Sequence, residues 1–397
     1  MRHFAIFGTH PRLSLAEIKA VKPNLDAPIL SGAAGIFEDA DWDGAMLMNR
    51  LGGTVKLGDI VGEYPVADLT AEQVVSLLLE TPRADRVVFG LTVYGGTPAA
   101  KKRFEKLPLE IKRALKANDK SARWVTSEGD APLSPAAVSK LKLTTEGYDI
   151  VVIIHGETAS IGFTSHVQDA DYWSERDFGR PARDDENGML PPKLARMMVN
   201  LGRIGDGETL LDPFCGSGTV LMEAALATKA GHIIGSDIDA MQTEMTRQNN
   251  EWLVKRHILR REDEPRFQLA TCDVRKVATH VREKIDAVVT EGYLGPALRG
   301  SESQNALDKT ADEITRLWSD ALTALKPLLN KGARLVCIWP AMKTSHGMAR
   351  IDLTDELSSL GYELENPLGD WDASNGPLLY SREGQRVMRR IVVLKIK

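Results

Sequence analysis

The stretch that most constrains the fold is residues 209–225, which read T-L-L-D-P-F-C-G-S-G-T-V-L-M-E-A-A. The apolar pair Leu210 and Leu211 leads into Asp212-Pro213, and a turn of small residues follows before an Ala- and Leu-rich helical segment. A strand, a glycine-rich turn and a helix in this order form the first unit of an α/β nucleotide-binding fold. Such a turn aims backbone N–H groups at a ligand above the carboxyl end of the strand.

The glycine spacing in this turn excludes two common nucleotide-binding motifs. A dinucleotide fingerprint needs a third glycine three residues after the second, and Leu221 stands at that position. A P-loop needs Gly-Lys-Ser/Thr, and this turn contains no lysine. The sequence D-P-F-C-G-S-G-T instead resembles motif I of the S-adenosylmethionine-dependent amino-methyltransferases, whose signature is D-P-F/M-C/A-G-S-G-T.

This resemblance implies S-adenosylmethionine as the cofactor. In that family the glycines let the backbone approach the methionine part of the cofactor, and the acid at the strand end faces its ammonium group. Cys215 is then a small residue that fits the turn rather than a nucleophile. The cofactor-binding residues that the resemblance implies here are Asp212, Pro213, Phe214, Cys215, Gly216, Gly218 and Thr219.

Length and composition describe an ordinary globular chain. The 397 residues suffice for two or three domains, and 43% hydrophobic with 26% charged residues is typical of soluble proteins. We find no signal-peptide core and no run of about 20 apolar residues that would span a membrane. The three cysteines form no metal-binding pattern and suit a reducing compartment. We therefore expect a cytoplasmic protein without a metal site.

Two modules are predicted before the motif I turn. Residues 1–60 are expected to form an N-terminal α+β region of ferredoxin-like type, starting with a strand at Arg2–Phe7 and a helix capped by Ser14. Residues 61–168 form the second module. It contains a helix opened by the capping box Thr70–Gln73, in which a threonine is followed three residues later by glutamine.

The segment 101–123 in the second module is strongly basic. It holds nine basic residues against three acidic ones, whereas the whole chain has a net charge of −5. Ile111 and Leu115 form a narrow apolar stripe, which leaves the basic side chains on an outer face. Such a face is either simply solvated or a surface that binds phosphates. The candidate phosphate contacts are Lys101, Lys102, Arg103, Lys112, Arg113 and Lys116.

The end of this module resembles a THUMP domain, an RNA-binding module of tRNA-modifying enzymes. Residues 150–169 carry the resemblance with I-V-V-I-I-H-G-E-T-A-S-I-G-F-T-S-H-V-Q-D, read as a strand, a hairpin and a second strand. In that family the module grips the acceptor end of tRNA. The resemblance therefore implies tRNA as a partner and makes the basic residues above its candidate contacts.

Residues 169–187 are expected to be a linker, and residues 188–397 the catalytic domain. The blocks R-D-F-G-R-P-A-R-D and G-M-L-P-P-K-L-A resemble the linker and helix entry of THUMP-containing tRNA guanosine-10 N2-methyltransferases. Pro191 or Pro192 suits the first position of the following helix. The charged linker residues Arg176, Asp177, Arg180 and Arg183 have two readings, interdomain salt bridges or contacts to RNA.

Two further acids stand at the ends of the next two predicted strands. Asp237 lies 19 residues after Gly218, close to the spacing at which an acid meets ribose hydroxyls in Rossmann-like folds. Asp239 is an auxiliary ligand or only a helix cap. The resemblance implies that Asp273 binds the adenine amine, and Ile238 and Val274 are expected beside these acids at the cofactor. Asp212, Asp237 and Asp273 thus stand at the ends of three consecutive predicted strands.

The fourth strand, Ile285–Thr290, should carry the chemistry, because amino-methyltransferases have D/N-P-P-Y/F after it. A carboxylate and a backbone carbonyl there accept the hydrogens of the target amine, and an aromatic ring stacks on the base. This chain has Glu291-Gly292-Tyr293 instead, with a longer acid and no proline. We expect Glu291 to orient the amine, the Gly292 carbonyl to assist, and Tyr293 to stack. The alternative is that Glu291 only forms a salt bridge within the loop.

The remainder should complete an α/β, Rossmann-like sheet of seven strands. A long helix is expected at Ala311–Leu325, and a fifth strand at Ala333–Trp339 that Pro340 ends. Residues 361–365 and 386–397 are expected to form an antiparallel end pair. The polar turn Ser381–Gln385 is read as a plain connection between strands rather than a contact to a base.

These observations predict an RNA methyltransferase that modifies an exocyclic amine in tRNA, with guanine N2 implied by the resemblance. Two alternatives stay open. The altered loop and the acidic net charge also suit a non-catalytic RNA-binding protein that retains the cofactor. A DNA amino-methyltransferase shares the motif I pattern, although the THUMP-like segment argues against it. A requirement for an accessory protein is also open.

Overall fold

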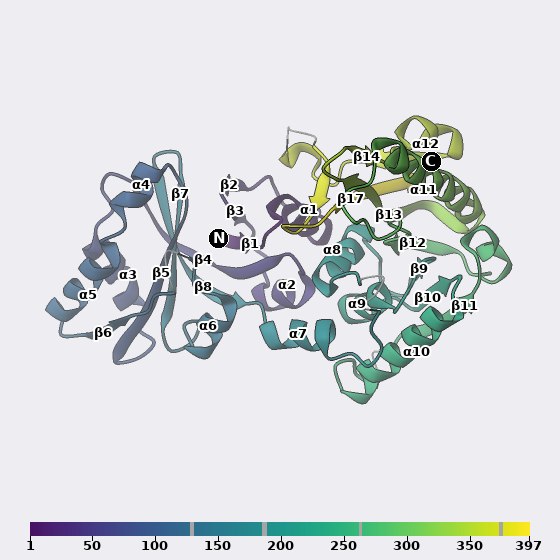
Figure 1. Cartoon of the computed structure of the whole chain (residues 1–397). Helices are drawn as coiled ribbons and strands as arrows, with labels where there is room; N and C mark the ends of the chain where they lie inside the picture. The colour runs from purple at the N-terminus through teal and green to yellow at the C-terminus, as the bar shows by residue number, and fades with distance from the viewer. Residues whose placement is uncertain (128–130, 185–188, 262–263, 373–375) are drawn as a thin grey trace. The chain divides into compact units, whose positions relative to one another are not determined.

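The computed structural model describes the chain except for residues 128–130, 185–188, 262–263 and 373–375. The chain forms two compact units, coloured by residue number in Figure 1. The first unit contains Met1–Ser14 and Asn24–Tyr172, and the second contains Leu15–Pro23 and Trp173–Lys397. None of the described helices is long and apolar enough to cross a membrane. The boundary predicted between residues 187 and 188 lies outside the described residues.

One mixed sheet forms the backbone of the first unit. Its order is β2-β3-β1-β4-β8-β7-β5-β6, in which β7, β5 and β6 pair in parallel and the other neighbours are antiparallel. The boundary predicted between residues 60 and 61 falls inside β4, so both predicted regions share this sheet. A THUMP-like role for residues 61–168 therefore remains a proposal. The strands are β1 (Arg2–Phe7), β2 (Ile29–Ser31), β3 (Ala34–Glu38), β4 (Thr54–Pro65), β5 (Arg86–Gly95), β6 (Ser121–Trp124), β7 (Tyr148–His155) and β8 (Thr158–Val167).

The helices of this part of the chain show one confirmed cap and one wrong one. In α3 the predicted capping box is present, since Thr70 Oγ1 accepts from the Gln73 N–H and Gln73 Oε1 from the Thr70 N–H. The Ser14 cap was wrong, because α1 begins at Pro11 and the Ser14 hydroxyl instead donates to the Gly53 carbonyl at 2.8 Å. The helices are α1 (Pro11–Val21), α2 (Gly44–Arg50), α3 (Ala71–Glu80), α4 (Pro98–Arg103), α5 (Leu107–Ala117) and α6 (Pro135–Lys140).

The second unit is built on a sheet that is parallel along most of its length. Its order is β11-β10-β9-β12-β13-β17-β15, with β17 antiparallel to both of its path neighbours. The predicted count of seven strands was too low, since nine described strands form the sheet; β14 pairs with β13 and β16 pairs with β17. The strands are β9 (Thr209–Asp212), β10 (His232–Asp237), β11 (Arg266–Thr271), β12 (Ile285–Thr290), β13 (Leu329–Lys343), β14 (Met348–Arg350), β15 (Tyr362–Glu365), β16 (Leu378–Tyr380) and β17 (Val387–Ile396).

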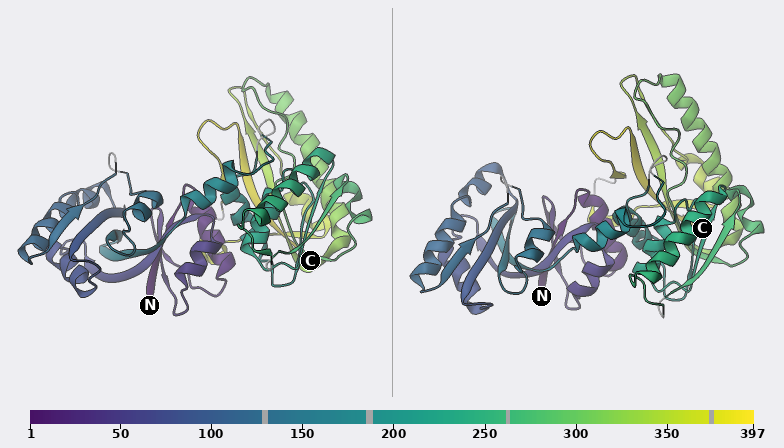
Figure 2. Two further views of the ribbon diagram at one scale, coloured as in Figure 1. Left: turned by 90° about the horizontal axis from the view of Figure 1, so that it is seen from below. Right: turned by 60° about the horizontal axis from the view of Figure 1, so that its bottom comes forward.

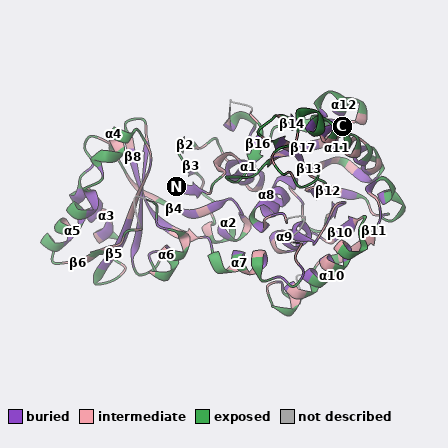
Figure 3. Ribbon diagram, viewed as in Figure 1, coloured by how far each residue is buried: buried purple, intermediate pink, exposed green. Residues whose placement is uncertain are grey.

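Helices cover both faces of this sheet (Figure 2). Leu211, Ile234 and Val288 join α11 in one buried cluster, whereas a Cβ at Gly202 of α8 would touch Val289. Because side chains alternate along a strand, α8 and α11 lie on opposite faces. Because helices cover both faces, β9, β10 and β12 are buried along most of their length (Figure 3). The helices are α7 (Ala170–Phe178), α8 (Pro192–Gly202), α9 (Thr219–Ala227), α10 (Ala240–Lys255), α11 (Gln304–Leu325) and α12 (Thr354–Leu360).

A buried charge cluster holds the predicted linker onto the second unit. Glu223 of α9 is fully buried and accepts hydrogen bonds from Arg176 Nε at 2.6 Å and from Arg196 Nε of α8 at 2.9 Å. Arg180 is also buried and donates to Thr219 Oγ1 at 2.6 Å. Arg176 and Arg180 therefore cannot contact RNA. These contacts to Glu223 and Thr219 lie within the second unit.

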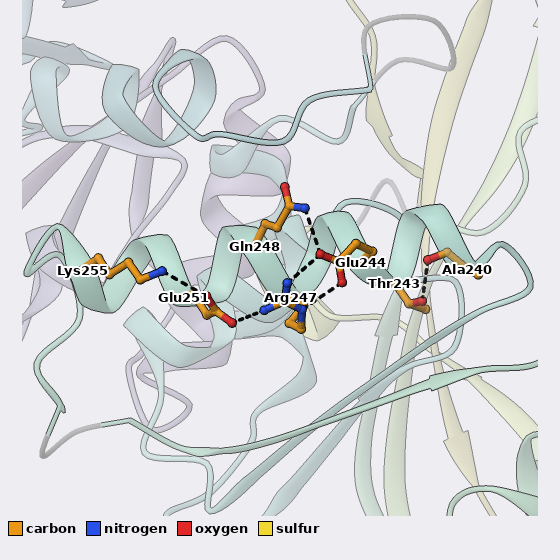
Figure 4. Close-up of polar contacts among 7 residues, drawn as sticks. All are labelled: Ala240, Thr243, Glu244, Arg247, Gln248, Glu251 and Lys255. Atoms are coloured by element: carbon orange, nitrogen blue, oxygen red, sulfur yellow. Dashed lines mark hydrogen bonds and ion pairs between the residues drawn. The ribbon is translucent and has the colours of Figure 1, made fainter.

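Figure 4 shows an exposed network of another kind along α10. Arg247 bridges Glu244 and Glu251, and Lys255 pairs with Glu251 at 3.1 Å. Exposed pairs of this sort contribute little, because water screens the charges. At the start of the same helix, Asp239 Oδ1 accepts from the Met241 N–H at 2.8 Å, which confirms Asp239 as the helix cap.

The predicted end of the fifth strand at Pro340 was wrong. β13 continues to Lys343, and Pro340 pairs with Arg389 of β17. The last residue of β13 paired with β12 is Cys337, so Pro340 interrupts no ladder with that neighbour. The strand can therefore pass through the proline and extend beyond the sheet's parallel part.

Candidate functional site

A cavity of about 800 Å³ opens at the carboxyl ends of β9, β10, β11 and β12, the edge where parallel α/β sheets bind ligands. It brings together every predicted site residue except Gly218. The predicted residues that line it are Asp212, Pro213, Phe214, Cys215, Gly216, Thr219, Asp237, Ile238, Asp273, Val274, Glu291, Gly292 and Tyr293.

Asp212 is the most buried acid of this cavity, with 1% of the residue exposed. Burial raises the pKa of Asp212 to about 7, and the negative charges of Asp237 and Glu291 act in the same direction. The N–H of Phe214 donates to Asp212 Oδ1 at 3.2 Å and only partly offsets this. Among the described residues no cation pairs with Asp212. A positively charged ligand group placed here would favour the ionised form of Asp212.

The two glycines of the motif I turn have different roles. Gly216 has a φ of 51° and lines the cavity, and a Cβ there would approach only Gln242 Oε1, at 3.8 Å. Gly218 has a φ of 87° and caps α9, and a Cβ there would lie 2.9 Å from Thr246. Gly216 therefore leaves open space for a ligand, whereas Gly218 allows α10 to pack closely behind the turn.

The acids of β10 and β11 lie at the cavity with different partners. Asp237 accepts from the N–H groups of Gly216 and Asp239, both at 3.0 Å, and each oxygen keeps a further lone pair. Asp273 pairs with Arg275 at 2.5 Å, and the hydrogen bonds from Arg275 lower the pKa of Asp273. A ligand amine at Asp273 must share this carboxylate with an exposed arginine.

Gln242 and Asp184 line the cavity, although the sequence reasoning did not select them as ligands. Gln242 Nε2 donates to Asp184 Oδ2 at 2.6 Å. Because a carboxylate only accepts hydrogen bonds, the Gln242 amide must turn its Nε2 toward Asp184. Its Oε1 then points away from Asp184. That oxygen is buried and has no hydrogen-bond partner among the described residues. It is an acceptor available to a ligand beside Gly216.

Glu291 follows β12 and forms an ion pair with Arg389 of β17, with 2.6 Å between Oε1 and Nε. Their side chains are 19% and 11% exposed, and both line the cavity. Burial raises the pKa of Glu291, and Arg389 opposes this rise. Glu291 thus forms a salt bridge, but its partner lies on β17 and not within the loop as the alternative had it, and the pair holds the acid at the cavity.

The loop around Glu291 differs in backbone from a D-P-P-Y loop. Gly292 has a φ of 72°, which proline cannot adopt because its ring fixes φ near −65°. A Cβ at Gly292 would lie 2.5 Å from Trp318 of α11, whose ring also packs on Phe214 of the motif I turn. Tyr293 is 51% exposed and lines the cavity, as a residue that stacks on an extruded base requires.

The segment Gly384–Val387 also lines the cavity, together with Arg389. Arg386 donates to the Leu298 carbonyl at 3.0 Å and so ties this segment to the loop after Tyr293. The interpretation of 381–385 as a plain connection missed this position. The sequence signal for this position is the pair Arg386 and Arg389, which stand just before and just after the start of β17.

We predict that Gly292→Ala destabilises the second unit by about 2–4 kcal/mol, because left-handed backbone strain adds to a clash with Trp318. Gly207→Ala is the matched control. Gly207 has a φ of 78° with no atom near its Cβ position, so strain alone should cost about 1 kcal/mol. Thermal unfolding of the full chain measures both. Equal shifts for the two variants would contradict the packing of Gly292 against Trp318.

Comparisons with known proteins agree with this architecture. Residues 180–351 match the family described as the RMKL-like methyltransferase domain. The crystal structure of TrmN from Thermus thermophilus superposes with a TM-score of 0.53 and 18% sequence identity, covering 100% of both chains. At this identity the likeness shows the fold alone.

Two curated relatives carry the name tRNA (guanine(10)-N2)-dimethyltransferase. The protein of Methanothermobacter thermautotrophicus is 38% identical over 108 residues, and that of Methanocaldococcus jannaschii is 32% identical over 163 residues. These matches cover 27% and 40% of this chain, and the chain spans only 28% and 43% of the relatives' own length. The predicted α/β methyltransferase fold is confirmed by the match of residues 180–351 to the RMKL-like methyltransferase domain and by the superposition on TrmN.

Proposed function

We propose that this chain is an S-adenosylmethionine-dependent methyltransferase that modifies an exocyclic amine of a base in tRNA, with guanine N2 as the target, in the cytoplasm. One observation carries the proposal. Acids from four neighbouring parallel strands, Asp212, Asp237, Asp273 and Glu291, meet in one cavity beside a half-exposed tyrosine. The names of the two curated relatives support tRNA and guanine N2 as the substrate and target.

The cavity fits the cofactor in charge and in its set of acceptors. S-adenosylmethionine carries an ammonium group, ribose hydroxyls and an adenine amine, all of which donate hydrogen bonds. Asp212 is a buried acceptor without a cation, Asp237 has free lone pairs, and Gln242 Oε1 is unpaired among the described residues. The open space at Gly216 lets backbone approach the ligand. We assign the ammonium to Asp212, the ribose to Asp237 and the adenine amine to Asp273.

The remaining part of the cavity suits a base with an exocyclic amine. The cofactor supplies an electrophilic methyl group when it is bound. Glu291 accepts a hydrogen bond from the amine and so turns the lone pair of the amine toward the methyl position, while the Gly292 carbonyl accepts a hydrogen bond from the second N–H. Tyr293 stacks on the extruded base. This assignment places binding and alignment, rather than covalent chemistry, on the protein.

A non-catalytic RNA-binding protein is the second candidate. It is favoured by one observation, the ion pair in which Arg389 occupies one oxygen of Glu291. If that pair blocks the acid, the cavity binds the cofactor without transferring its methyl group. Methyl transfer therefore separates the two candidates.

The surface of α4 and α5 is the proposed tRNA contact. Its members Lys101, Lys102, Arg103, Lys112, Arg113 and Lys116 are all exposed, while Ile111 and Leu115 are fully buried. The helices thus present positive charge to solvent on a chain whose net charge is negative. Such a patch binds phosphates by releasing counterions.

We expect the chain to transfer labelled methyl from S-adenosylmethionine to unmodified tRNA, with N2-methylguanosine as the product. Glu291→Ala should lower kcat about 100-fold or more, because the amine loses its acceptor, with little change in the Kd for S-adenosylhomocysteine. The control is Glu313→Ala, an exposed glutamate of α11, which should keep full activity. No transfer by the wild type with intact cofactor binding would favour the binding protein.

The raised pKa of Asp212 predicts a pH-dependent affinity for the cofactor product. An ammonium ligand needs the ionised carboxylate, so the Kd for S-adenosylhomocysteine should rise as pH falls below about 7, by up to about tenfold per pH unit. Asp212→Asn should remove this dependence and weaken binding. Titration calorimetry between about pH 5.5 and about pH 8 measures it, and a pH-independent Kd in the wild type would contradict the assignment.

In the ligand-free protein the same pKa shift acts on stability with the opposite sign. The folded state holds the Asp212 proton more tightly than the unfolded chain does, because burial disfavours the charged carboxylate. The contribution of Asp212 to stability is therefore fully present below pH 3.8 and falls as pH rises to about 7.

Charge reversal at Lys101, Lys102 and Arg103 should weaken tRNA binding and leave the affinity for S-adenosylhomocysteine unchanged. Each phosphate that is no longer neutralised should reduce the slope of log Kd against log salt by about 0.7–0.9. Reversal at the exposed residues Lys309, Arg316 and Lys331 of the second unit is the control. An unchanged slope in the first variant would indicate that α4 and α5 present an ordinary solvated face and do not bind tRNA.

A further inference from the structure

We propose that Arg389 is the positioning residue of the catalytic loop, holding one oxygen of Glu291 so that the other faces the substrate amine. The inference rests on the proposed methyl transfer and goes beyond it, because neither the motif nor the relatives' names assign a role to β17. On this inference the ion pair with Arg389 does not block Glu291 but orients its carboxylate.

The geometry gives the two carboxylate oxygens different environments. Arg389 Nε donates to Glu291 Oε1 at 2.6 Å, and no described residue donates to Oε2. A charge-assisted hydrogen bond at one oxygen leaves the lone pairs of the other available. Because both residues line the cavity, the free oxygen belongs to the acceptor set of the site. One fixed and one free oxygen is the arrangement that an amine acceptor needs.

The loop needs such a contact because its own backbone lacks stiffening. A D-P-P-Y loop is held by two prolines, each with one restricted dihedral angle. Here Gly292 follows the acid directly, in a left-handed conformation packed on Trp318. Glycine has the largest backbone freedom of any residue. The ion pair therefore supplies from β17 the restraint that the prolines supply within the loop.

Arg389 is well placed to act as a rigid partner. It lies in the antiparallel ladder between β13 and β17, opposite Pro340, and its side chain is 11% exposed. The charged groups near Glu291 are Arg389 from β17 and Asp212 from the end of β9. Arg389 favours the ionised form of Glu291, whereas burial disfavours it. Without Arg389, burial would move Glu291 toward its neutral form.

The test compares Arg389→Met with Arg390→Met in the full chain. Arg390 is the next residue of β17 and pairs with Asp352 at 3.4 Å, outside the cavity. We expect Arg389→Met to lower kcat about 100-fold, the effect of a displaced acceptor, with the Kd for S-adenosylhomocysteine within about threefold of wild type. The acid limb of the kcat profile should also move to higher pH, since the ionised Glu291 loses its cation. Arg390→Met should change neither quantity.

A purely structural role for Arg389 would lower the unfolding temperature and leave the acid limb in place, which would overturn the inference. Unchanged kcat in Arg389→Met would overturn it as well. If that variant fails to bind S-adenosylhomocysteine, Arg389→Gln keeps a side-chain donor without the charge, and the same two readouts decide. Absence of methyl transfer by the wild type would overturn the proposed function together with this inference, whereas an active wild type with an indifferent Arg389 would overturn the inference alone.

Discussion

The site depends on one constraint, the meeting of four parallel strand ends at one edge of the sheet. Each of β9, β10, β11 and β12 runs in the same direction, so the residues at or just after their carboxyl ends face the same space. In this chain each of these ends carries an acid, and burial makes adjacent carboxylates unfavourable. The structure tolerates them in different ways. Asp237 accepts backbone N–H groups, Asp273 and Glu291 take arginines, and Asp212 shifts its pKa.

The same edge is supported from behind by the buried cluster around Glu223. Glu223 lies on α9, the helix that starts directly after the motif I turn, and two arginines hold it from α7 and α8. Removing one partner of such a cluster leaves an uncompensated buried charge, so the arrangement is strongly specified even where its net stabilisation is small. Arg180 adds a bond to Thr219, the first residue of α9. The two linker arginines thereby hold α9 in place, and α9 follows the motif I turn directly.

Much of this architecture is readable from sequence because it is local. β1 and β12 have the predicted bounds, since each is a run of mostly apolar residues ended by polar or turn-forming ones. The motif I turn and the acids at the strand ends are readable for the same reason. The chain's family resemblance then placed them in one site.

Where local signals competed with tertiary pairing, prediction failed: β13 passes through Pro340 because β17 pairs with it there. The residues that sequence reasoning missed come to the cavity from distant segments, with Gln242 and Asp184 meeting across 58 positions and Arg389 and Glu291 across 98. No periodicity or spacing links such pairs, and only the sheet order brings β17 beside β13.

The loop after β12 shows how a local loss can be balanced by a distant contact. Two prolines restrain an acid through covalent geometry, which needs no other part of the molecule. Gly292 lacks that restraint but packs closely on Trp318 of α11. The Trp318 ring also contacts Phe214, so that it lies between the loop and the motif I turn. The orientation of Glu291 must then come from outside the loop, and a mostly buried guanidinium is suited to this because its planar donors fix direction as well as charge. On this inference β17, the last strand of the chain, contributes to the site, and Arg389 compensates for the departure from the D-P-P-Y pattern.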